Sequence, residues 1–117
     1  MVDRKFSDVG RIDLGDMEHL VLLAILRLGA DAYGIPILDQ VCARSGREVS
    51  RATVYVALKR LEQKGLVSSR LGDSTPERGG RAKRYYRIKP GGLKALRESR
   101  AMFLGFWRDL ESVLDRA

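Results

Sequence analysis

Residues 50–92 read SRATVYVALKRLEQKGLVSSRLGDSTPERGGRAKRYYRIKPGG, a helical pattern followed by two strand-like segments. The helical part has apolar residues at the i, i+3, i+4, i+7 spacing that predicts one buried helix face: Val54, Ala57, Leu58 and Leu61. Segments 66–71 and 83–89 then alternate apolar and polar residues on either side of a loop rich in Gly, Pro and Arg. We therefore predict a helix over residues 51–64 and, after it, a β-hairpin with a basic loop at its tip.

The ends of these elements carry residues of the expected types. Ser50 can cap the start of the helix, and Gly65 can end it. Alternation within the hairpin predicts that four side chains face the core: Val67, Leu71, Tyr86 and Ile88.

Two helical patterns precede this stretch and one follows it. The first begins at Asp16, a potential N-cap, and is ended by Gly29; the second closes at about Ser45, and the last runs from residue 90 to about Asp115. Three helices, a hairpin and a further helix give a mainly α fold with a small β-hairpin. This order predicts a winged helix-turn-helix with a long C-terminal dimerisation helix.

The chain has 117 residues, which is enough for one compact unit. We divide it into a flexible N-terminal arm at 1–13, a winged helix-turn-helix domain at 14–89, and a dimerisation helix at 90–117. The first part has no sustained periodicity, because Asp and Gly interrupt it.

A homodimer is expected because two helices are more apolar than one small domain can cover. The first helix has apolar side chains around nearly its whole circumference. The last helix repeats large apolar residues every seven positions, as helices do at a helix–helix seam. The expected interface residues are Leu20, Leu23, Leu96, Phe103, Trp107, Leu110 and Leu114.

Positive charge is concentrated in the stretch quoted first. Residues 50–92 hold eleven Lys or Arg and three Asp or Glu, whereas the other 74 residues hold eleven and twelve. Excess positive charge on one helix and an adjacent loop is typical of a surface that binds nucleic acid phosphates. The predicted contacts to double-stranded DNA are Arg51, Thr53, Tyr55 and Lys59 on the helix, and Arg78, Arg81, Lys83 and Arg84 in the wing.

The chain resembles the PadR family of bacterial transcriptional regulators from about Leu14 to Leu96. The specific motifs are Ala-Tyr-Gly at the start of the second helix, Thr-Val-Tyr in the third, and the wing ending in Lys-Arg-Tyr-Tyr-Arg-Ile. A single helix after the wing is similar to the family's shorter subfamily, whose members dimerise through the first and last helices. Val56 departs from the Pro that many relatives carry there.

The resemblance implies a DNA-binding regulator and adds Tyr33 and Ser50 to the expected DNA contacts. The expected function is that of a repressor that binds a pseudo-palindromic operator as a homodimer. Some relatives respond to phenolic or flat hydrophobic molecules. Phe103, Phe106 and Trp107 could therefore hold a small aromatic effector at the dimer interface, although they could equally be interface core.

The sequence argues against several other classes of protein. No Gly-rich phosphate loop, Ser-His-Asp set or pair of carboxylates in an apolar setting points to an enzyme, so no catalytic residue is expected. His19 and Cys42 are the only His and Cys, so neither a Cys/His metal site nor another cofactor is expected. Because apolar runs are short and no signal peptide pattern is present, no membrane association and a cytoplasmic location are expected.

One alternative from a different class stays open. A winged helix can also serve as a protein-interaction or small-molecule-sensing module without a direct DNA role. The localised positive charge favours DNA.

Overall fold

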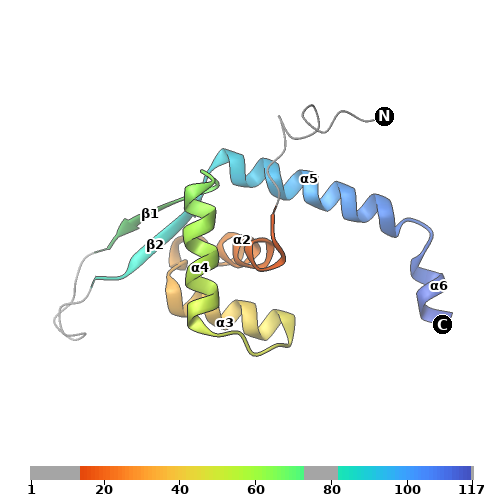
Figure 1. The fold of residues 1–117 in the computed structure, drawn as a ribbon, viewed down its shortest axis with the longest axis horizontal. Helices are drawn as coiled ribbons and strands as arrows, with labels where there is room; N and C mark the ends of the chain where they lie inside the picture. The colour runs from red at the N-terminus through yellow and green to blue at the C-terminus, as the bar shows by residue number, and fades with distance from the viewer. Residues whose placement is uncertain (1–13, 73–81, 117) are drawn as a thin grey trace.

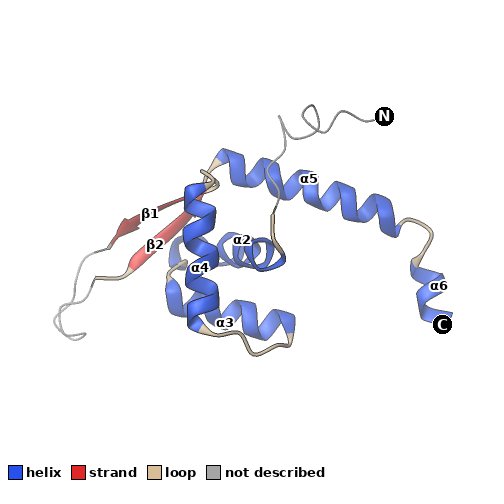
Figure 2. Cartoon of the chain, viewed as in Figure 1, coloured by secondary structure: helices blue, strands red, loops and turns tan. Residues whose placement is uncertain are grey.

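A computed structural model describes residues 14–72 and 82–116. Helices α2, α3 and α4 form a bundle, the β1–β2 hairpin projects from one side of it, and α5 extends from the other (Figure 1). Within the described residues the hairpin is the only sheet, and helices make up most of the fold (Figure 2). This confirms the expected mainly α winged-helix fold. The elements are α2 (Asp16–Leu28), a 3-10 turn (Gly29–Asp31), α3 (Gly34–Ser45), α4 (Arg51–Gln63), β1 (Val67–Leu71), β2 (Arg84–Ile88), α5 (Pro90–Trp107) and α6 (Glu111–Arg116).

The core lies where α4 packs against α2 and α3. All four residues of the predicted stripe on α4 are buried, and they meet Val21, Leu22 and Ile25 of α2 and Ile37 and Val41 of α3 in one apolar cluster. Full burial of a Leu or Ile side chain stabilises a fold by about 1.5–3 kcal/mol. The helical periodicity of α4 therefore determines which of its faces points outward.

Helix α4 begins and ends as the sequence predicts. The Oγ of Ser50 accepts a hydrogen bond from the amide of Thr53 at 3.1 Å, and Gly65 follows the helix with a φ of 75°. Such a positive φ favours glycine because other residues are strained there. The predicted cap of α2 is wrong: Asp16 lies inside the helix and Gly15 is its N-cap, with the Gly15 amide donating to Glu18 Oε1 at 2.9 Å.

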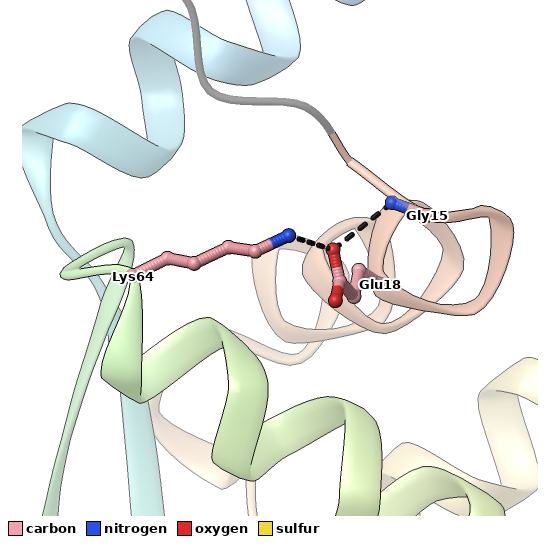
Figure 3. Close-up of polar contacts among 3 residues, drawn as sticks. All are labelled: Gly15, Glu18 and Lys64. Carbon is pink, nitrogen blue, oxygen red and sulfur yellow. Dashed lines mark hydrogen bonds and ion pairs between the residues drawn. The ribbon is translucent and has the colours of Figure 1, made fainter.

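Glu18 joins the start of α2 to the end of α4. Its carboxylate accepts hydrogen bonds from the Gly15 amide and, at 2.6 Å, from Lys64 Nζ (Figure 3). Burial by itself would raise the pKa of Glu18, but these hydrogen bonds and the charges of Lys64 and Arg60 outweigh it and lower the pKa below its ordinary value of 4.5. The carboxylate is therefore charged in the folded protein at neutral pH.

The two strands pair in antiparallel register, with Val67 opposite Ile88 and Leu71 opposite Arg84. Val67 is buried, and Tyr86 and Ile88 pack against the core, as predicted. The prediction for Leu71 is wrong, because its side chain is 59% exposed. Alternation does place Leu71 on the same face as Val67, but the hairpin has extended beyond the bundle at that point and no helix covers it (Figure 1).

Helix α5 is attached to the hairpin through Gly92. A Cβ at this position would overlap the Leu66 carbonyl oxygen and lie 2.8 Å from Ile88 Cγ2. The backbone of α5 therefore packs directly on the start of the hairpin. One turn later Ala95 and Leu96 are buried in the same core.

The C-terminal helix is present but is not continuous to Asp115 as predicted. Helix α5 ends at Trp107, Asp109 has a φ of 68°, and the separate helix α6 begins at Glu111. Asp is one of the few non-glycine residues that adopt this left-handed conformation readily. Every residue from Ala101 to Arg116 is exposed, so among the described residues little burial opposes the break. Across the described ranges, no helix is both long and apolar enough to span a membrane.

Replacing Gly92 with Ala should lower the free energy of unfolding by about 1–3 kcal/mol, because the new methyl group overlaps backbone that cannot easily move. Gly105→Ala is the matched control, since a Cβ on that α5 residue would meet no atom within 4 Å. Denaturant unfolding measures both variants. Equal stabilities of the two would show that α5 does not pack this closely on the hairpin.

Replacing Glu18 with Gln should destabilise the protein at neutral pH by about 1.5 kcal/mol, near the low end for charged hydrogen bonds because water screens the partly exposed Lys64. Since folding lowers the pKa of Glu18, its contribution is full above 4.5 and disappears as pH falls through the folded pKa. Unfolding curves of wild type and variant should therefore converge in acid. Glu98→Gln, the same change at an exposed position on α5, is the matched control.

Candidate nucleic-acid interface

The outward face of α4 carries Arg51, Tyr55 and Lys59, spaced four residues apart. All three are exposed, and they follow one flank of the helix beside its buried stripe, with Lys59 the furthest from it. The phenol of Tyr55 lies against the start of α3, where a Cβ on Gly34 would come within 2.6 Å of its oxygen. The absence of a side chain at Gly34 thus lets α4 and α3 share one continuous surface.

Ser50 and Thr53, two further predicted contacts, occupy the exposed start of α4. Their hydroxyl groups lie 2.8 Å apart in a mutual hydrogen bond, in addition to the bond from the Thr53 amide to Ser50. Both side chains therefore have a structural role in capping. Each hydroxyl can make further hydrogen bonds to an incoming ligand.

Tyr33 and Lys83 are brought together although they are far apart in the sequence. Tyr33 is the N-cap of α3, and its backbone forms an isolated antiparallel bridge with Tyr85 of β2. Lys83 Nζ lies 4.3 Å from the centre of the Tyr33 ring, within the range of a cation–π contact. The start of α3 and the base of the wing thus form one surface, adjacent to α4 (Figure 1).

Arg84 occupies a different environment, on the face of the hairpin that meets α4. Its Nη1 donates to Ser69 Oγ at 2.9 Å, and Ser69 Oγ donates to Glu62 Oε2 at 2.7 Å. Burial raises the pKa of the neighbouring Tyr86 above 10.0, and the charge of Glu62 adds to this effect. This network ties the hairpin to α4, so Arg84 helps to position the wing.

Two predicted contacts, Arg78 and Arg81, lie outside the described residues, as does the predicted arm at 1–13.

Sequence reasoning missed two residues at the base of the wing, Arg70 and Tyr85. These face each other across the strands, with Arg70 Cζ lying 5.1 Å from the centre of the Tyr85 ring. Strand alternation alone could not pair them, because the pairing depends on the register of the hairpin.

A second exposed surface, which is apolar, lies between α2 and α5. Leu23 is 40% and Leu26 is 53% exposed, and together with residues of α5 they line a groove of about 470 Å³. His19 stacks on Phe103 across this groove at a ring distance of 6.3 Å. Arg97 and Arg100 also line it. Apolar side chains this exposed are typical of a surface that a partner covers.

The predicted interface residues differ in their exposure. Trp107 is 42% and Phe103 is 49% exposed on α5, while Leu110 and Leu114 are exposed beyond the helix break. Leu20 is half-buried against the core of its own chain. Leu96 is only 8% exposed, so it forms the floor of the groove and leaves little side chain for a partner.

No group of three His, Cys, Asp or Glu side chains that could hold a metal ion occurs among residues 14–72 and 82–116. Cys42 is half-buried, and its Sγ donates to the Val49 carbonyl oxygen at 3.6 Å. The polar groups of the candidate nucleic-acid interface are the cations, tyrosines and hydroxyl groups described above.

Comparison with known proteins identifies the family. The model of the transcriptional regulator PadR-like family matches residues 22–98. The chain is 30% identical over 111 residues to an uncharacterized protein of Lysinibacillus sphaericus, covering 93% of this chain and 91% of that protein. It is 45% identical to Transcriptional regulator Rv3488 of Mycobacterium tuberculosis over 65 residues, or 54% of this chain and 55% of the relative.

Solved structures agree. A PadR family transcription regulator from Clostridium difficile superposes with a TM-score of 0.66 at 26% identity, covering 87% of this chain and 97% of that one. A PadR family transcriptional regulator from Eggerthella lenta gives a TM-score of 0.64 at 28% identity, with coverages of 84% and 83%. Members of this family are regulators of transcription and not enzymes. By its motifs, its fold and these relatives, the chain belongs to the PadR family of transcriptional regulators.

Proposed function

We propose that the protein is a transcriptional repressor that binds a pseudo-palindromic operator as a homodimer. The observation that carries this proposal is the continuous basic surface formed by the outer face of α4, the start of α3 and the base of the wing. A recognition helix in a major groove presents such a face to the bases, while flanking cations contact phosphates. As a regulator of chromosomal genes, the protein would act in the cytoplasm.

The residues of this surface divide into two roles. Arg51, Thr53 and Tyr55 lie at the start of α4, the part of a recognition helix that meets base edges. Lys59 lies further along the helix and is suited to contact phosphate. The remaining proposed phosphate contacts are Tyr33, Ser50, Arg78, Arg81, Lys83 and Arg84.

The apolar surface between α2 and α5 supports the homodimer. A second copy would cover Leu23, Leu26 and the large side chains of α5 and α6. A two-fold interface would also place two α4 helices at a fixed separation, as two half-sites about one DNA turn apart require. The break at Asp109 lets α6 take a different direction from α5, and α6 would then contact the partner separately.

We also propose that a small aromatic molecule releases the repressor from DNA. Phe103, Phe106 and Trp107 have the i, i+3, i+4 spacing that places them on one side of α5, and all are exposed. Large rings that meet across a two-fold axis can stack on a flat molecule. Binding there would change how the two subunits are held relative to each other.

DNA binding should weaken steeply with salt, with a log–log slope of about −7 if the dimer contacts about eight phosphates. Lys59→Ala should make the slope shallower by about 2, because each subunit loses one phosphate contact worth about 0.9. Lys94→Ala removes an exposed cation from α5, away from this surface, and serves as the control. Affinity that does not change with salt would contradict the proposal and favour a role in protein interaction or sensing.

The Trp107→Asp substitution should convert the dimer to a monomer, because it places a charge in the proposed apolar interface. Sedimentation measures the assembly state of the full chain. Leu71→Asp is the matched control, since Leu71 is also an exposed apolar residue, at 59% against 42% for Trp107, and lies on the hairpin outside the proposed interface. A Trp107→Asp protein that remains dimeric would show that the subunits associate through another surface.

A further inference from the structure

We propose that Tyr33 and Tyr85 are positioning residues that hold Lys83 and Arg70 as a two-cation clamp for the DNA phosphate backbone at the base of the wing. This inference rests on the proposed DNA-binding function of the same surface. It adds Arg70 to the phosphate contacts, and it replaces the direct phosphate contact of Tyr33 with a role in which each tyrosine acts through its cation.

The four side chains come from three segments and form one chain of contacts. The Tyr33 and Tyr85 rings lie 5.3 Å apart with their planes at 57°, a usual geometry for an aromatic pair. Lys83 Nζ lies 4.3 Å from the Tyr33 ring centre, and Arg70 Cζ lies 5.1 Å from the Tyr85 ring centre. Each cation therefore has its own aromatic ring, and the rings support each other.

Backbone contacts hold this cluster in place. The Tyr86 amide donates to the Ala32 carbonyl oxygen at 2.8 Å, which joins the start of α3 to β2. The Gly72 amide donates to the Lys83 carbonyl oxygen at 2.7 Å and extends the hairpin pairing by one step. A Cβ on Gly72 would lie 2.7 Å from Tyr85 Cε1, so the chain has no side chain where this ring needs space.

The arrangement leaves both cations able to bind an anion. Within the described residues the ion pair formed is Glu18–Lys64, so no carboxylate there neutralises Lys83 or Arg70. A cation stacked on a ring keeps its remaining N–H donors directed away from the ring. Phosphate oxygens of a DNA backbone are the matching acceptors. The clamp lies on the hairpin face away from α4, and Tyr33 connects it to the α4 surface because the adjacent Gly34 lies against Tyr55.

Stacking explains why tyrosines are useful here. Lys and Arg lose much side-chain freedom when they bind a phosphate. Side chains already held on rings have lost part of that freedom before DNA arrives, so binding costs less. The clamp would therefore fix the base of the wing on the DNA backbone.

The test is the salt dependence of binding by the full chain to a mixed-sequence DNA duplex long enough to span a dimer. Tyr85→Leu should weaken binding about tenfold and make the slope shallower by about 2, because each subunit loses the contact of Arg70. Tyr85→Phe keeps the ring and should behave like wild type. An unchanged slope for Tyr85→Leu would overturn the clamp.

A double-mutant cycle separates positioning from a purely structural role. Tyr33→Leu should weaken binding in the wild-type background but have little further effect in a Lys83→Ala background, because Tyr33 acts through Lys83. Independent, additive losses would contradict the clamp even if Tyr33→Leu also lowered stability. If the wild-type protein binds the duplex with an affinity that does not depend on salt, both the proposed function and the clamp are overturned. If wild-type binding does depend on salt but the tyrosine variants bind as the wild type does, only the clamp is overturned.

Discussion

The structure depends first on the packing of α4 against α2. Leu58 and Leu61 of α4 are fully buried against Leu22 and its neighbours, and this contact determines which way α4 faces. Because a helix has fixed periodicity, burying this stripe leaves Arg51, Tyr55 and Lys59 exposed along one flank of α4. The Glu18–Lys64 pair fixes the far end of α4 to the start of α2 (Figure 3). The core therefore orients the proposed DNA-reading face before any ligand is present.

The hairpin is held against this bundle on both of its faces. On one face, Arg84 and Ser69 connect it to Glu62 of α4. On the other, Tyr85 contacts Tyr33 at the start of α3. A hairpin of two strands is marginally stable by itself, so these contacts give the base of the wing its defined position. Helix α4 and the base of the wing are therefore held in a defined position relative to each other.

The C-terminal segment, formed by α5 and α6, is packed against the core only where it begins. Helix α5 begins firmly packed at Gly92 and Leu96, but every residue of its later turns, from Ala101 on, and of α6 is exposed. Together with Leu23 and Leu26 of α2, they form an apolar surface that one copy leaves uncovered. In a regulator with paired half-sites, such a surface would couple subunit association to operator spacing.

The sequence by itself determined the helices, the hairpin and the outward face of α4. Each depends on residues a few positions apart, as with the stripe from Val54 to Leu61, the Ser50 cap and the stop at Gly65. The tertiary structure decided which segments far apart in the sequence contact one another and which side chains they leave exposed. It placed Tyr33 beside Tyr85 and Lys83, and it left Leu71 without a covering helix. It also allowed the break at Asp109, where the described residues on either side are exposed. A seven-residue repeat predicts only which side chains would align if the helix continued.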